Sequence, residues 1–200
     1  MTRLRTIVLF TFLFAMASAT SVFADSGFTG PFAQANWTET LNGGSINTSG
    51  MPTTLGLTSR DVGGCPSGAG SALTSFSITV ALPTTLSFNW DYSTQDIDGP
   101  LHDPARFSVN GIPTQLTNDA GSSTQNGVVN NLHLSPGDTF AFEEFSDDSV
   151  CGAGTVTISN FTFIQQVNLA GIPTLSEWGM IILSSMLALG AAFILRRRRR

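Results

Sequence analysis

Alternation of apolar and polar side chains dominates the middle of the chain. In residues 73–82 (LTSFSITVAL) and 85–92 (TLSFNWDY) every second position is apolar, with Trp90 on one face and Asp91 on the other. A period of two is typical of a half-buried strand. Similar short segments, separated by Gly, Ser, Asn and Pro, recur through residues 25–166 without helical periodicity. Eight or nine such strands predict an all-β fold, an antiparallel β-sandwich with a jelly-roll-like topology.

Two local features sharpen this prediction. Asn110-Gly111 lies between two short apolar segments, and this dipeptide favours the type I′ turn of a tight hairpin. The apolar positions also change parity near Asn160, from Ile158 to Phe161, which predicts a β-bulge in the last strand.

The N-terminus has the pattern of a secretory signal peptide. Residues 1–24 contain a basic start, an apolar stretch over residues 7–17 and a small-residue pattern that ends at Ala24. We expect signal peptidase to cut before Asp25, so the chain is predicted to be exported.

The C-terminus has the pattern of a single membrane span. Residues 179–195 carry no charge and would form a helix of roughly 25 Å, close to the thickness of a bilayer core. The chain then ends in Arg196, Arg197, Arg198, Arg199 and Arg200. Five guanidinium groups do not cross a membrane readily, which predicts an N-out, C-in topology in the inner membrane. A buried core helix followed by a basic tail is disfavoured, because the helix is apolar on every face.

A short motif precedes this span, and a plain anchor would not need it. Its residues are Ile172, Pro173, Thr174, Leu175, Trp178 and Gly179. The segment 172–200 resembles the IPTL-CTERM protein-sorting signals of Gram-negative, exopolysaccharide-producing bacteria. The resemblance implies processing by a membrane-embedded protease or transpeptidase called exosortase H. Pro173 keeps the motif extended, as a protease cleft requires.

The remaining chain predicts one domain over residues 25–166 and a short linker over residues 167–171. The domain has two arginines, no lysine and 13 carboxylates, which gives a net charge of −11. Such a surface repels nucleic acid, which we exclude as a partner. It also repels acidic polysaccharide unless a cation bridges the two. An acidic exopolysaccharide is therefore a candidate partner only when a cation bridges it to the domain.

The two cysteines, Cys65 and Cys151, lie in glycine-rich segments of an exported chain, which predicts a disulfide. Zinc ligation is disfavoured, because His102 and His133 do not have the spacing of a zinc site relative to them.

An acidic segment is the densest candidate site, and its carboxylates are Asp91, Asp96, Asp98 and Asp103. A second acidic stretch lies beside a later loop and holds Glu143, Glu144, Asp147 and Asp148. If the two loops meet at one end of the sandwich, their oxygens could hold Ca²⁺. The alternative is that the aspartates serve turn formation and solubility.

The sequence contains none of the common catalytic motifs, so no catalytic residues are predicted. The leading hypothesis is a non-enzymatic sandwich sorted to the cell envelope or extracellular matrix. A calcium-assisted carbohydrate- or matrix-binding module is the second hypothesis. A glycoside hydrolase is the third, since that chemistry needs only two well-placed carboxylates.

Overall fold

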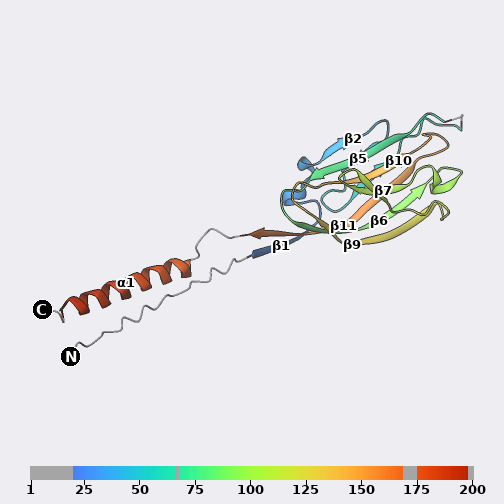
Figure 1. Cartoon of the computed structure of the whole chain (residues 1–200). Coiled ribbons are helices and arrows are strands. Elements are labelled where there is room, and N and C mark those ends of the chain that lie inside the picture. The colour runs from blue at the N-terminus through green and yellow to red at the C-terminus, as the bar shows by residue number, and fades with distance from the viewer. Residues whose placement is uncertain (1–19, 66–67, 169–174, 198–200) are drawn as a thin grey trace, which may run out of the picture. The chain divides into compact units, whose positions relative to one another are not determined.

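Two antiparallel β-sheets pack face to face as a sandwich (Figure 1). The computed structural model describes residues 20–65, 68–168 and 175–197. The first sheet has the order β3 (Ser45–Asn47), β4 (Leu55–Thr58), β11 (Gly154–Asn168), β6 (Thr84–Thr94) and β9 (Thr124–Leu134), with β1 (Thr20–Ser26) beside β11. The second has the order β2 (Thr38–Thr40), β5 (Ala72–Thr79), β10 (Thr139–Ser146), β7 (Ala105–Val109) and β8 (Ile112–Gln115).

The connections follow a jelly roll, as the sequence predicts. From β4 to β11 the strands divide into the orders β4-β11-β6-β9 and β5-β10-β7-β8. This arrangement of eight strands is the double Greek key of that fold. Three short 3₁₀-helices complete the domain: η1 (Gly30–Phe32), η2 (Gln34–Asn36) and η3 (Gly99–Leu101).

The local predictions for the strands are confirmed. Burial alternates along β6, with Trp90 in the core and Asp91 exposed. Asn110 and Gly111 have φ angles of 54° and 75°, and they close the β7–β8 hairpin as a two-residue turn. The pairing of β11 with β6 shifts register between Ser159 and Thr162, which places the expected bulge in the last strand.

The core between the sheets is rich in aromatic rings. Trp37 stacks on Phe76 with ring centroids 4.6 Å apart, and on the ring of Phe142 at 5.8 Å. Its indole nitrogen donates a hydrogen bond of 2.9 Å to the carbonyl oxygen of Phe32. The buried aromatic area and the satisfied N–H both stabilise this region.

The structure differs from the sequence prediction in strand number. It has eleven described strands, because β2 and β3 are only three residues long and too short to show alternation. The last strand continues to Asn168, so the expected linker 167–171 begins inside β11.

The expected signal peptide lies partly in β1 and otherwise outside the described residues. Cleavage before Asp25 would remove five of the seven residues of β1. The side chains of Val22 and Phe23 are each 58% exposed. Their removal would therefore take no buried apolar side chain from the sandwich.

The C-terminal helix α1 covers Leu175–Arg197 and includes the predicted span 179–195. Its segment from Trp178 to Arg197 has a mean hydropathy of 2.1, and its side chains there are exposed. The length and composition are sufficient to cross a membrane.

Candidate functional site

Three loops meet at one end of the sandwich, as the hypothesis of a shared acidic site requires. We call the segments 59–71, 95–104 and 147–153 the loop end. Backbone hydrogen bonds join them: Asp147 N donates to His102 O at 3.0 Å, and Val62 N donates to Ser149 O at 3.0 Å. The loops approach so closely that a Cβ atom at Gly152 would collide with backbone atoms of residues 95 and 96.

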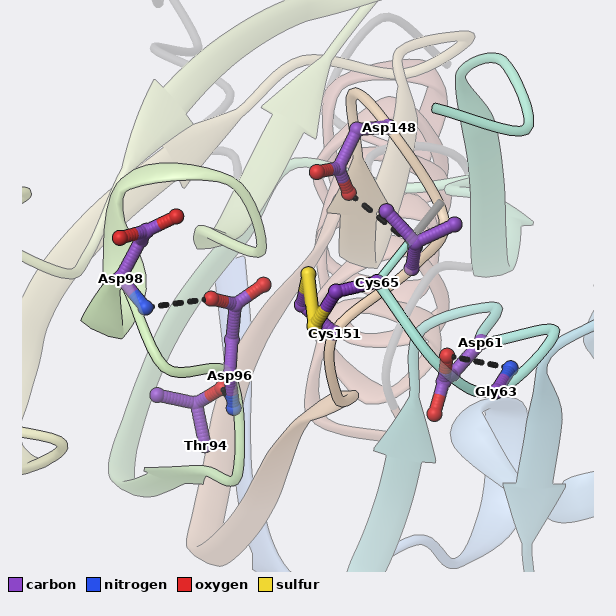
Figure 2. Close-up of a disulfide and its surroundings, with 9 residues drawn as sticks. Asp61, Gly63, Cys65, Thr94, Asp96, Asp98, Asp148 and Cys151 are labelled. Carbon is purple, nitrogen blue, oxygen red and sulfur yellow. Dashed lines mark hydrogen bonds between the residues drawn. A yellow bond between two sulfur atoms is a disulfide. The ribbon is translucent and has the colours of Figure 1, made fainter. Parts of the chain in front are cut away.

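The predicted disulfide between Cys65 and Cys151 is present at the loop end (Figure 2). It joins residues 86 positions apart, and the two Cα atoms are 4.5 Å from each other. A closed loop of this length stabilises a fold by about 4 kcal/mol when it constrains the unfolded chain. It also fixes segment 59–71 beside segment 147–153.

Asp96 is a buried carboxylate in this end. Its side chain is 5% exposed, and its Oδ1 accepts a hydrogen bond of 2.7 Å from the backbone N–H of Asp98. Thr94 Oγ1 accepts a hydrogen bond of 2.9 Å from the backbone N–H of Asp96. Hydrogen bonds therefore fix the turn both before and after Asp96. No donor among the described residues reaches Asp96 Oδ2.

Asp103 lies deeper, with a side chain that is 0% exposed. Ser59 Oγ donates to its Oδ1 at 2.8 Å, whereas its Oδ2 has no partner in the described part of the chain. Tyr92 Oη donates to the backbone oxygen of Asp103 at 2.7 Å. Burial raises the pKa of the Asp103 carboxyl to about 6, and the charges of Asp96 and Asp148 contribute.

Glu143 and Glu144 are neighbours on β10 that face opposite sides of the sheet. Glu143 accepts a hydrogen bond from Arg106 Nε at 2.7 Å and one from Ser108 Oγ at 2.6 Å. Glu144 is 0% exposed, and within the described residues neither of its oxygens has a hydrogen-bond partner. Burial, and then the charge of Asp103, raise the pKa of Glu144 well above its usual range.

A histidine and two aspartates form a compact group in the same region. His102, Asp147 and Asp148 each offer a ligand atom, and these atoms lie within 4.8 Å of one another. His102 Nδ1 and Asp147 Oδ1 are 2.8 Å apart. The hydrogen bond to Asp147 raises the pKa of the His102 imidazole.

The four aspartates predicted as a calcium site are not gathered into one group. Asp91 lies on the outward face of β6, opposite the face on which Tyr92 contacts Asp103, and Asp98 is exposed. Among the described residues, only His102, Asp147 and Asp148 meet the spacing of a metal group. Neighbours along a strand point to opposite faces, so Asp91 and Tyr92 lie on different sides of β6.

Sequence reasoning identified most members of the loop end but not how deeply they are buried. Glu144 is in phase with Phe140 and Phe142 on β10, and this parity was the available signal that it faces the core. His133 is exposed on β9 and its Nδ1 lies 2.9 Å from Thr85 Oγ1, away from this site.

The sorting residues are described in part. Leu175 begins α1, and Trp178 and Gly179 lie in its first turns. Arg196 and Arg197 lie in its last turn. Residues 172–174 and 198–200 lie outside the described residues.

Comparisons with known proteins separate the tail from the sandwich. The IPTL-CTERM motif matches residues 170–200, so the chain carries this sorting motif at its C-terminus. No curated protein matches the chain.

Several solved structures resemble the sandwich at low similarity. The CBM36-1 domain of a multidomain xylanase from the hindgut metagenome of Trinervitermes trinervoides has 10% identity and a TM-score of 0.35, with 74% of this chain and 100% of that chain covered. TmCBM61 in complex with β-1,4-galactotriose has 11% identity and a TM-score of 0.36, with coverage of 70% and 94%. The Podospora anserina GH26-CBM35 β-(1,4)-mannanase has 15% identity and a TM-score of 0.32, with coverage of 76% and 29%. Similarities of this size identify no ligand for the chain.

Proposed function

We propose that this protein is exported, held in the inner membrane by α1, and then processed at its IPTL motif for display at the cell surface or in the extracellular matrix. The observation that carries the proposal is the complete motif, which from Leu175 onward lies in a helix that is apolar and exposed over Trp178–Arg197. The helical segment 178–197 has 20 residues, which corresponds to about 30 Å, the thickness of a bilayer core.

The tail would act by positioning the motif. The arginines after Leu195 remain on the cytoplasmic side, which leaves the motif at the outer boundary of the membrane. Pro173 has no backbone N–H and disfavours helix at the residue before it, which suits a segment that a protease must bind in extended form. A membrane-embedded enzyme of the exosortase type would then cut within or beside residues 172–175.

The sandwich is proposed to be non-enzymatic. Two depressions in the described surface have volumes of about 110 and 420 Å³. The smaller is lined by residues 31–32, 78–82 and Gln165, and the larger by Asn42, Arg60, residues 71–73 and Phe145. Neither lining includes a carboxylate, whereas a glycoside hydrolase needs two of them beside its substrate. These two depressions therefore do not provide a glycosidase site.

The test is to replace residues 172–175 by four alanines and to follow the chain in its host. The expected result is full-length protein retained in the inner membrane, with its terminal arginines intact by mass spectrometry. A Met186→Leu variant, changed inside the helix, should mature normally and serves as the control. Normal maturation of the alanine variant would contradict the proposal.

A second candidate function is cation-assisted binding of carbohydrate or another matrix component by the loop end. The buried Oδ2 atoms of Asp96 and Asp103, which have no partner in the described chain, favour it. Such oxygens are costly to bury unless a cation or water satisfies them. Retention on a column of host exopolysaccharide should be lost on chelation and restored by a divalent cation. Equal retention with and without chelator would count against this function.

A further inference from the structure

The group formed by His102, Asp147 and Asp148 unites two loops that are far apart in sequence. One ring nitrogen and two carboxylate oxygens lie within 4.8 Å of one another. In a tetrahedral zinc site with bonds of 2.0–2.2 Å, ligand atoms are separated by roughly 3.4 Å. The three groups are therefore close to coordination distance, and a metal bound through His102 Nδ1 and Asp147 Oδ1 would replace the hydrogen bond of 2.8 Å between these two atoms.

A second observation in the loop end concerns a buried carboxylate oxygen. Asp96 is only 5% exposed, and its Oδ2 accepts no hydrogen bond from the described residues. Figure 2 shows this second oxygen turned away from Asp98 and toward the disulfide, on the side where Asp148 lies.

We propose that His102, Asp147 and Asp148 bind a divalent transition metal, and that Asp96 completes the site as a further carboxylate. The mixed donor set decides the class of metal. An imidazole ligand suits zinc and other first-row metals, and carboxylates also suit manganese, whereas calcium takes oxygen ligands. The site therefore selects Zn²⁺ or Mn²⁺ over Ca²⁺.

The consequence of binding would be a second cross-link in the loop end. The backbone bond from Asp147 N to His102 O and the Cys65–Cys151 disulfide already hold the loops together. A metal would add a connection between segments 95–104 and 147–153, and this connection would form only when the metal ion is available. This inference goes beyond the proposed sorting, because the site can bind metal whether or not the tail is cut.

The experiment is a titration of the full-length protein in detergent with Zn²⁺, Mn²⁺ and Ca²⁺, followed by calorimetry and by thermal unfolding. We expect binding of Zn²⁺ and Mn²⁺ with a rise in Tm, and at least tenfold weaker binding in His102→Gln. His133→Gln is the matched control, because His133 is an exposed histidine on β9 outside the site. It should bind metal like the unchanged protein.

Three results would overturn the proposal. These are no response to Zn²⁺ or Mn²⁺ at millimolar concentration, equal weakening in both histidine variants, and a response to Ca²⁺ alone. If the His102→Gln variant failed to fold, nuclear magnetic resonance of the unchanged protein would be used to locate the metal instead. The His102 ring signals should then shift with metal while those of His133 stay in place, and the reverse pattern would also overturn the site.

Discussion

The interior of the sandwich contains two regions built on opposite principles. Around Trp37, aromatic rings stack on one another and the indole N–H has its acceptor. Around Asp103, carboxylates are equally buried, but one oxygen of Asp103 and both oxygens of Glu144 have no partner among the described residues. Burying apolar area stabilises a fold, whereas burying an unsatisfied charge costs free energy.

The difference separates the stabilising part of the domain from its candidate site. The aromatic region supports the jelly roll through packing alone and needs nothing from solution. The polar region is held by the disulfide and by hydrogen bonds between loops, and burial raises the pKa values of its Asp103 and Glu144 carboxyls. Unfavourable local arrangements persist in folded proteins where the surrounding structure fixes them, and they cluster at functional sites.

The largest expected effect comes from removing the centre of the aromatic region. Trp37→Ala should lower the free energy of unfolding by about 3 to 5 kcal/mol, because it leaves a cavity between Phe76 and Phe142. Chemical denaturation of the full-length protein measures this. Ile112→Ala is the control, since that side chain is 72% exposed and should change stability by less than about 0.5 kcal/mol. Equal effects of the two variants would contradict the assignment of the core.

The adjacent glutamates of β10 test the comparison more directly. Glu143→Met should destabilise the fold by about 2 to 4 kcal/mol, because it leaves the Arg106 guanidinium and the Ser108 hydroxyl without their acceptor. Glu144→Met should be neutral or stabilise by about 1 kcal/mol, since it removes a buried carboxyl without partners in the described chain.

Urea unfolding of both variants measures whether each substitution lowers or raises the free energy of unfolding. If Glu144→Met were instead the more damaging change, the Glu144 carboxyl would have a stabilising partner that the hydrogen bonds of the described residues do not include. The polar region would then be a satisfied network, and the contrast with the aromatic region would fail.

Much of the fold could be predicted from the sequence, because it rests on local signals. Alternation identified β6, and the turn chemistry of Asn110-Gly111 identified the β7–β8 hairpin. A change of parity identified the bulge near Asn160. Very short strands such as β2 gave no such signal, since their existence depends on pairing with β5.

The site was less predictable, because it depends on which face each carboxylate takes. Proximity in sequence grouped Asp91 with Asp96 and Asp103, although the alternation of β6 already assigned Asp91 to the outward face. The contact of His102 with Asp147 joins loops that are 45 residues apart, and only the sandwich topology creates it. Side-chain orientation and long-range contacts therefore limited the prediction of the site.

The smallest expected effect is a dependence of stability on pH that has an unusual sign. The pKa of Asp103 is about 6 in the folded protein, because burial raises it above its ordinary value of 3.8. Its contribution is therefore fully present below the unfolded pKa and is lost as the pH rises through about 6. The raised pKa values of Glu144 and His102 act in the same direction.

The free energy of unfolding should accordingly fall by an amount on the order of 2 kcal/mol between about pH 4 and pH 7. Asp103→Asn should flatten this slope, because asparagine does not titrate. The control is Asp138→Asn. The hydrogen bond from Asn110 lowers the pKa of Asp138, so this carboxyl stabilises the fold at higher pH and loses its effect as the pH falls.

Saturating Mn²⁺ should also reduce the slope, since a bound cation favours the charged carboxylates that protons otherwise neutralise. A slope that is unchanged by both Asp103→Asn and Mn²⁺ would show that the buried carboxyls of the polar region do not govern its stability.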